Sequence, residues 1–440
     1  MKISKLALIV VVACGTNAGN VFADQTNDIQ LVFCESNCDC GDSVCGCEPV
    51  CDSDACDGDA CDGGCDSAGC GLDVGNGRLC DSLADLVGFG DCCLGDPWQL
   101  FGECNRISAG GWLQSGYQSD LQGFGLGTYE RSNFNSYPEH LQLQQGWLFA
   151  ERAIDASCGF DIGGRVDFLY GTDAQDVQAF GNSGGTGYDN SWDNGQHYGS
   201  ALPQLYMEIG YGDLSVKVGH MFTDIGYESV AATNNFFSSH SFAFNIAQLS
   251  YTATGVVATY AGLDNVTLTG GWIEGINTGF EDNGDAFFGG VALDLTDRLD
   301  VSYNVIGGTL NAVDYNDRSY IHSVVAAYDV RCDLQYVMQT SLTEVSGDSD
   351  SSAVGISNYL IKTVSDCMSV GARFEWLSCD NIALAPSEKL DLYELTLGMN
   401  YRRCANLVFR PELRWDWIEG GSGGGITNQF SYATSAIMTF

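Results

Sequence analysis

The sequence predicts an all-β fold: a transmembrane, antiparallel, up-and-down β-barrel of about sixteen strands, preceded by an irregular cysteine-rich N-terminal segment. Three observations predict it. Apolar and polar residues alternate with period two over most of residues 105–440, aromatic residues recur at a spacing of eight, and short connections alternate with long ones.

The composition narrows the class of protein. The chain carries 57 Asp and Glu against 18 Lys and Arg, which gives a formal net charge of −39. This excess of negative charge argues against binding to nucleic acid or to an anionic membrane surface. The sequence also contains no run of 18 apolar residues, so helical membrane spans are not expected.

Residues 1–23 are predicted to be a signal peptide. A positively charged start is followed by an apolar core from Leu6 to Ala13, and small residues precede a cleavage point after Ala23. An alternative is cleavage before Cys14 with lipidation of that cysteine, because the residues around it resemble a lipobox. Both interpretations predict export, and we expect the mature protein in the outer membrane.

Residues 24–104 form an acidic, cysteine-rich segment with fourteen cysteines, 18 acidic residues and a single basic residue. So few large apolar side chains cannot bury a core, so disulfide bonds are expected to hold this periplasmic segment together. Cysteine pairs of the Cys-x-x-Cys type and histidines are both missing here, which argues against zinc or an iron–sulfur cluster. We expect no cofactor, although the aspartates of residues 52–66 leave loose calcium binding open.

The barrel is predicted from residues 105–440. In the stretch from Phe160 to Tyr170, the even positions are mainly apolar and the odd positions mainly polar or charged. In a transmembrane barrel the apolar face meets lipid and the polar face meets a wet lumen. Aromatic pairs eight residues apart fit the roughly 20 Å between two aromatic girdles. These pairs are Phe160/Phe168, Tyr320/Tyr328, Tyr393/Tyr401, Phe409/Trp417 and Tyr432/Phe440.

Connections of two lengths alternate along this region, as in outer-membrane barrels. The predicted short turns lie near 154–157, 212–213, 262–265, 296–298, 329–332, 365–367 and 402–405. The long loops between them include 120–139, 172–200, 222–250 and 420–428. Seven short turns and eight long loops predict sixteen strands with both ends on the periplasmic side. The last strand ends on Phe440, a feature of strands that the barrel assembly machinery recognises.

Two blocks resemble the family of OmpL-like putative β-barrel porins. They are Lys217 to Glu228, with the motif Lys-Val-Gly-His-Met-Phe, and Asn234 to Asn245, which reads Asn-Asn-Phe-Phe-Ser-Ser-His-Ser-Phe-Ala-Phe-Asn. The resemblance covers roughly residues 105–440. It departs from the family at 247–255, where the family's histidine is missing. It implies a pore, and it names no solute.

No catalytic set is apparent, so we expect no enzyme activity. His240 lies among Ser238, Ser239 and Ser241, but immediate neighbours in a loop do not face one another as a nucleophile and base would. Packing of the loop is therefore the favoured role. The barrel cysteines are Cys158, Cys332, Cys367 and Cys404, on short turns, and Cys379, in a long loop. We expect them to cross-link neighbouring turns or to link turns to residues 24–104.

The expected site is the lumen. Charges of both signs on the polar face suit a water-filled channel. The predicted pore-lining residues are Arg152, Asp161, Arg165, Asp167, Glu208, Lys217, Glu394, Arg410, Glu412, Arg414 and Asp416, with Gln142 and Gln144 beside them.

The long loop from Phe222 to Ser250 is expected to fold inward and narrow the pore, because four phenylalanines in nine residues need a surface to bury against. An alternative is that they cap the outer rim or a subunit interface. The predicted constriction residues are Asp224, Glu228, Phe236, Phe237, His240, Phe242 and Phe244, with Asp224 and Glu228 facing wall cations such as Arg165 and Lys217.

The sequence therefore predicts passive diffusion of small hydrophilic solutes or ions, with weak cation selectivity because residues 105–440 are acidic overall. The expected partners are outer-membrane lipid, the solutes and the assembly machinery, and a homo-oligomer is compatible with the sequence. The alternative is a structural or cell-surface anchoring barrel with little or no transport.

Overall fold

The computed structural model describes residues 94–100, 106–119, 134, 137–157, 159–180, 189–195, 197–223, 225–280, 284–310, 319–346, 350–381, 388–420 and 428–440. Several predictions concern residues outside these ranges: the signal peptide, lipidation at Cys14, the aspartates of residues 52–66, Asp224 and Cys158. Of the predicted cysteine-rich segment, residues 24–104, the structure describes only 94–100.

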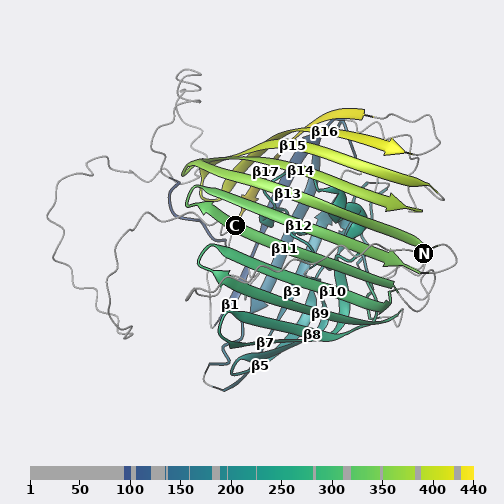
Figure 1. Ribbon diagram of the computed structural model, residues 1–440. Coiled ribbons are helices and arrows are strands. Elements are labelled where there is room, and N and C mark those ends of the chain that lie inside the picture. The colour runs from purple at the N-terminus through teal and green to yellow at the C-terminus, as the bar shows by residue number, and fades with distance from the viewer. Residues whose placement is uncertain are drawn as a thin grey trace.

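The described chain forms one antiparallel sheet closed into a barrel (Figure 1). The first strands are β1 (Ile107–Gln118), β2 (Gln142–Arg152), β3 (Phe160–Gly171), β4 (Gly199–Ala201), β5 (Leu205–Tyr211) and β6 (Leu214–Phe222). The middle strands are β7 (Thr252–Leu263), β8 (Val266–Ile273), β9 (Asp285–Thr296), β10 (Leu299–Thr309), β11 (Ser319–Arg331) and β12 (Leu334–Val345). The last are β13 (Ser351–Ser365), β14 (Met368–Asp380), β15 (Lys389–Cys404), β16 (Leu407–Gly420) and β17 (Asn428–Thr439).

The barrel has sixteen wall strands, as predicted, because β4 and β5 are two pieces of one strand. Both pair with β3, and the break between them contains Pro203, which lacks the N–H that a continuous ladder requires. The barrel closes where β1 pairs antiparallel with β17, with Trp112 opposite Thr439. Every other wall strand pairs with its neighbour in the sequence.

Alternation along the strands separates the two faces of the wall. On β15 and β16, Leu397, Leu413 and Trp415 are about half exposed on the outside, whereas Thr396 and Arg414 between them are buried inside. Tyr393 and Trp417 stack on the outer face with ring centroids 5.4 Å apart. This pattern is the one that lipid outside and a filled or wet lumen inside require.

The short connections are tight turns. Gly212 and Asp213 alone join β5 to β6, and Gly212 has a φ of 56°, the left-handed conformation that two-residue hairpin turns require. On the same rim, the backbone of Trp98 pairs with the Asn406 side chain at 2.6 and 2.7 Å, which docks residues 94–100 against the turn between β15 and β16. Among the described residues, no helix is long and apolar enough to cross a membrane.

Cys379 lies in strand β14, and the expectation that it belongs to a long loop is wrong. Its side chain is buried beside Leu377, Leu390 and Leu392. These apolar side chains extend the inner face toward the end of β14, and β14 and β15 remain paired as far as Asp380.

Candidate functional site: the loop inside the barrel

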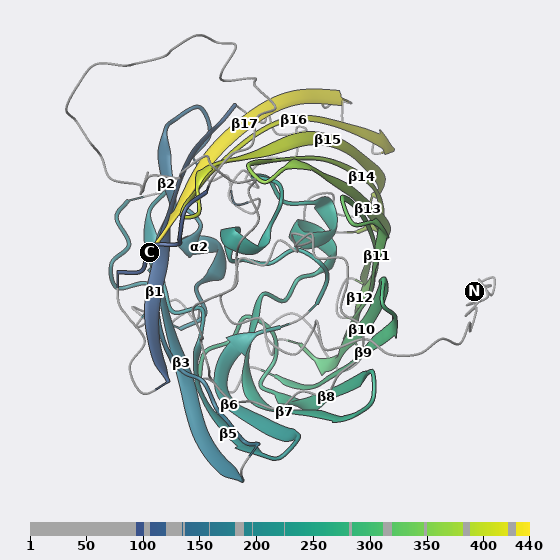
Figure 2. The same cartoon turned by 90° about the vertical axis from the view of Figure 1, so that its left-hand side faces the viewer.

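The long connection between β6 and β7, residues 223–251, lies inside the barrel, and we call it loop 3 (Figure 2). It contains the short helices η2 (Ala232–Asn234) and η3 (Ala243–Ala247). Phe236, Phe237, Phe242 and Phe244 are each at least nine-tenths buried. Removal of one such side chain from water contributes about 2 kcal/mol, so the phenylalanines supply much of the reason for this position.

Two glycines on the wall receive two of these rings. Gly371 of β14 lies directly opposite Gly398 of β15. A Cβ atom at Gly371 would lie 2.5 Å from the Phe236 ring, and one at Gly398 would lie 2.9 Å from the Phe237 ring. The glycine pair therefore forms a hollow in the inner wall that the loop fills.

Arg373 is the centre of an ionic network between the wall and loop 3. Its guanidinium lies 2.5 Å from Glu394 on β15 and 2.6 Å from Glu228 on the loop, and it also donates to the Ser239 carbonyl at 2.8 Å. Arg414 extends the network, with 3.1 Å to Glu394 and 2.8 Å to Asp416. All these side chains are buried, so each charge depends on its partners.

Two arginines of β16 also bind the backbone of loop 3. Arg410 donates to the carbonyls of Ala232 and Asn235 at 2.9 and 2.8 Å. Arg414 donates to the His240 carbonyl at 2.6 Å. The guanidinium groups thus face loop carbonyls and carboxylates.

Carboxylates of the wall accept the N–H groups that loop 3 points at them. Glu412 accepts from Ser238 and Ser239 at 2.7 and 3.1 Å. Glu375 accepts from Phe242 and Ala243 at 2.5 and 2.6 Å, where η3 begins. A carboxylate at such a helix start satisfies N–H groups that have no partner within the helix.

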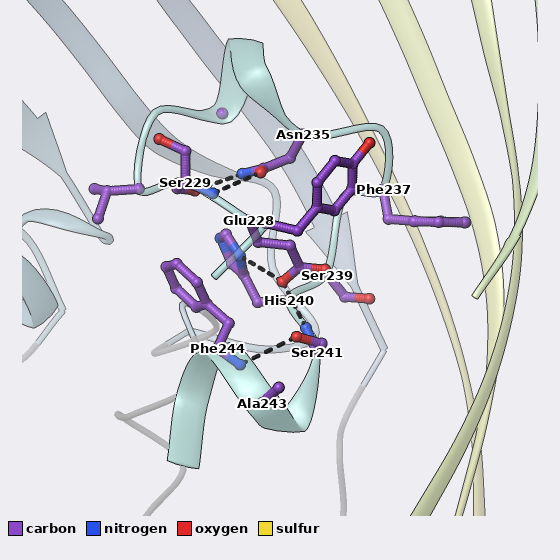
Figure 3. A network of polar contacts seen from close by, with 12 residues as sticks. Glu228, Ser229, Asn235, Phe237, Ser239, His240, Ser241, Ala243 and Phe244 are labelled. Atoms are coloured by element: carbon purple, nitrogen blue, oxygen red, sulfur yellow. Dashed lines mark hydrogen bonds and ion pairs between the residues drawn. The ribbon is translucent and has the colours of Figure 1, made fainter. Parts of the chain in front are cut away.

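Glu228 contacts His240 and Ser241 within loop 3 (Figure 3), and it also contacts the wall at Tyr359. Its carboxylate accepts from the Ser241 N–H at 2.8 Å, lies 3.3 Å from His240 Nδ1, and accepts the Tyr359 hydroxyl at 3.1 Å. Burial alone would raise the pKa of Glu228, but Arg373 and His240 outweigh it and lower the pKa to about 2. Glu228 is therefore ionised at neutral pH.

A second set of hydrogen bonds joins loop 3 to β2. Gln145 donates to the Val230 carbonyl at 2.8 Å and to Asp173 at 3.0 Å, and it accepts from the Ala232 N–H at 3.1 Å. Asp173 precedes α2 (Ala174–Val177) and is buried. Burial raises the pKa of Asp173 to about 7, although hydrogen bonds from Gln145 and Thr172 act in the opposite direction.

Most predicted pore-lining residues lie on the inner face. Arg165 and Asp167 form a buried pair at 2.7 Å, while Asp161 lies at the start of the same strand. Glu208 and Lys217 are opposite each other on β5 and β6, half-buried, with the Lys217 ammonium 4.8 Å from the Tyr206 ring centre. The remaining inner-face residues are Gln142, Gln144, Glu394, Arg410, Glu412, Arg414 and Asp416.

The prediction that Arg152 faces the lumen differs from the strand register. A β-bulge at Gln144–Gln145 shifts the alternation of β2, so that Trp147 and Glu151 point inward and Arg152 takes the outer face. Arg152 lies at the end of β2 and pairs with Asp161 at 3.0 Å.

The expected partners of Glu228 also differ. Arg165 instead binds Glu151 and Asp167, at 2.9 and 2.7 Å, and Glu228 meets Arg373. Arg373 and Glu375 were missed, although they occupy alternate positions of β14 opposite to Phe374, which was signal enough to find them. Glu151 was missed because the bulge exchanges the inward and outward positions over the second half of β2.

The rest of the inner wall is more accessible. Near the short turns that join β7 to β8 and β9 to β10, the inward side chains include the small, half-buried Thr259, Thr269 and Ser302. Farther along these strands the inner face is covered by buried apolar side chains such as Phe288 and Ile306. Close to the short turn between β9 and β10, Asp294 lies opposite Asp300. This side of the inner wall therefore presents neutral hydroxyls and carboxylates, whereas the arginines of β14 and β16 lie under loop 3.

The arrangement shows no catalytic assembly around His240. Its ring stacks on Phe244 with centroids 4.1 Å apart and its Nδ1 faces Glu228, while Ser241 Oγ accepts from the Phe244 N–H at 3.1 Å. No three His, Cys, Asp or Glu side chains in the described part of the chain gather as a metal-binding group.

A closed antiparallel barrel of sixteen wall strands with a long loop folded into it defines the class of outer-membrane porins. The chain belongs to the family described as putative beta-barrel porin-2, OmpL-like, which matches residues 106–440. No curated protein matches the sequence.

Solved porins share the fold at low identity. OmpF of Salmonella typhi in complex with daunomycin has a TM-score of 0.52 at 13% identity and covers 76% of this chain and 98% of its own. The channel DcaP of Acinetobacter baumannii has 0.51 at 11%, with 76% and 97% covered. An anion-selective porin from Comamonas acidovorans has 0.50 at 11%, with 76% and 99% covered.

Proposed function

We propose that the protein is an outer-membrane porin, not an enzyme, through which small hydrophilic solutes and ions diffuse passively with a weak preference for cations. The family and the fold support the porin. The preference is a separate proposal, because a structural neighbour is anion-selective.

The distribution of charge across the lumen carries this proposal. The inner arginines Arg373, Arg410 and Arg414 are each less than one-tenth exposed and bind loop carbonyls or carboxylates. The accessible wall over β9 and β10 carries Asp294 and Asp300. A permeating ion would meet carboxylates more readily than guanidinium groups, and such a lining favours cations.

The pore is proposed to run between loop 3 and the inner wall of β7 to β10, with Asp161, Glu208 and Lys217 near its path. Loop 3 itself packs on β12, where the Gln339 side chain accepts the Tyr227 N–H at 2.8 Å. Phe236, Phe237, Phe242 and Phe244 are proposed to hold loop 3 in position as a constriction, together with Glu228 and His240. Asp224 belongs to the same proposed constriction.

Residues 1–23 are proposed as the export signal, and residues 24–104 as a periplasmic segment held by disulfides, to which Cys332, Cys367 and Cys404 on the periplasmic turns would connect. The barrel assembly machinery is the proposed partner of the strand that ends at Phe440.

Single-channel recording tests the proposal. Two forms purified in detergent are added to planar bilayers in KCl: the full-length protein and a variant that lacks residues 24–104. Stepwise conductance is expected for both forms. A heat-modifiable, folded protein that inserts without conductance would instead support an anchoring barrel.

A further inference from the structure

Four glutamines on the inner face of the barrel each carry at least one amide atom that has no hydrogen-bond partner among the described residues, and we call them the glutamine cluster: Gln114, Gln142, Gln144 and Gln429. Each is at least nine-tenths buried. The unpartnered atoms are Oε1 of Gln114 and Gln144 and both amide atoms of Gln142 and Gln429.

The strand register arranges the cluster as a line on three neighbouring strands. Gln142 lies opposite Gly116 of β1, and Gln114 lies two positions nearer the periplasm on the same face. Gln429 is the second residue of β17 and lies four residues before Ala433, which pairs with Gln118. Gln429 and Gln114 are therefore separated by about eight strand positions, which corresponds to about 26 Å along the wall.

The neighbouring Gln145 shows how different a satisfied glutamine is. Its amide is fully occupied by loop 3, Asp173 and the Trp112 indole, which donates to it at 3.0 Å. Gly116 makes room for the cluster, because a Cβ atom there would lie 2.4 Å from Gln144 Oε1. The wall thus accommodates Oε1 of Gln144 and gives it no hydrogen-bond partner among the described residues.

A buried amide without a partner loses the hydrogen bonds it would make in water, so such groups are rare in folded proteins unless water or a ligand binds them. Four of these atoms, on Gln114, Gln142 and Gln144, lie within about two strand positions of one another and therefore mark a place where something else binds. The two atoms of Gln429 lie farther up the wall toward the extracellular rim. The cluster carries donors and acceptors and no charge. A hydroxyl group, which both donates and accepts, complements it, whereas a cation or an anion would satisfy only one kind of atom.

We propose that the glutamine cluster binds the hydroxyl groups of neutral, hydroxyl-rich solutes, such as small sugars, as they enter from the extracellular rim. The inference rests on the proposed porin function and adds a solute class to it. At the inner end the cluster opens on a small pocket beside loop 3, lined in part by Asp173 and Arg410. The pocket has room for about one water molecule, so a single hydroxyl can replace that water.

The test compares two uncharged or zwitterionic solutes of similar size that do not cross lipid readily. Liposomes containing the full-length protein are placed in L-arabinose, which carries hydroxyls, or in glycine betaine, which has none, and the swelling rates give a permeability ratio. The variant carries Gln→Met at all four cluster positions, because methionine keeps the shape and removes the amide. Gln335→Met, on the inner face of β12, is the matched control.

We expect the arabinose-to-betaine ratio to fall roughly fivefold in the quadruple variant, the effect of losing about one hydrogen bond in the permeating state. Gln335→Met should leave the ratio as in the wild type, and KCl conductance should persist in all variants. An unchanged ratio in a quadruple variant that conducts KCl would overturn the inference and leave the porin function intact.

If the quadruple variant does not assemble, Gln144→Met and Gln429→Met are measured singly. A reduced ratio in either supports the inference, and unchanged ratios in both overturn it. Absence of KCl conductance in the folded wild type would overturn the porin function, and the inference with it.

Discussion

At the scale of single residues, the alternation of the wall decides which substitutions the barrel tolerates. Val166 and Leu397 lie on the outer face near the middle of their strands and are 41% and 52% exposed. An arginine facing lipid at mid-depth costs about 2–4 kcal/mol. We expect Val166→Arg and Leu397→Arg to block assembly, measured as loss of the heat-modifiable band in outer-membrane fractions.

The control is Ser302→Arg on the half-buried inner face of β10, which should assemble normally. Gly163 also faces inward but is unsuitable, because a Cβ atom there would lie 2.2 Å from the Arg152 carbonyl oxygen. Equal behaviour of all three arginine variants would contradict the assignment of faces.

Glu228 is the residue whose loss should loosen loop 3 most directly. Glu228→Gln keeps the shape but removes the charge 2.6 Å from Arg373, which is fully buried. Removal of one partner from a buried ion pair costs about 3–5 kcal/mol. We expect the free energy of unfolding of the variant to fall by about this amount, measured by guanidinium denaturation in detergent.

Asp333→Asn provides the comparison, because Asp333 pairs with Lys362 and Arg331 on an exposed turn. Exposed pairs contribute about 0–1 kcal/mol. Equal destabilisation by the two variants would show that the network around Arg373 does not hold the loop.

At the scale of elements, loop 3 is the structure that fills the lumen. Deletion of residues 234–244 removes its four buried phenylalanines and the backbone groups that bind Arg410 and Glu412. We expect single-channel conductance in KCl to increase. Unchanged conductance in a heat-modifiable deletion variant would rule out a constricting role.

The seat of loop 3 on β2 should make stability depend on pH through Asp173. Its pKa is raised by burial from 3.8 to about 7, so between these values the folded protein keeps a proton that the unfolded chain releases. Stability from this group therefore falls as pH rises from about 4 to 7. Asp173→Asn should reduce the loss of Tm between pH 5 and pH 8 in detergent. An identical pH dependence in wild type and variant would contradict this assignment.

Local patterns predicted the elements well, and long-range contacts were harder to predict. Period-two alternation and a Gly-Asp turn at 212–213 act within a few residues, so the wall strands and turns could be predicted. The bulge at Gln144–Gln145, which moves Arg152 outward, depends on the register with β1. The pairing of Glu228 with Arg373 joins residues 145 positions apart, and no spacing in the sequence encodes it.

At the scale of the whole molecule, selectivity depends on which charges remain accessible. Since the arginines of β14 and β16 are covered, we expect a reversal potential that favours K⁺ over Cl⁻ in a KCl gradient at low salt. The preference should weaken at high salt, because the screening length falls from about 30 Å at 0.01 M to about 3 Å at 1 M. Anion preference at low salt would contradict the proposed cation path.

Loop 3 also bridges the line along which the barrel closes. It binds Arg373, Arg414 and Arg410 on one side of the junction between β17 and β1, and Gln145 on the other, while Ser238 reaches Ser435 of β17 at 3.0 Å. The loop is encoded in the middle of the chain, yet the surface of β16, β17 and β2 that it binds is complete only when the first and last strands have paired. Such distant contacts form late in folding. Loop 3 thus acts as an internal clasp whose insertion can mark completion of the ring.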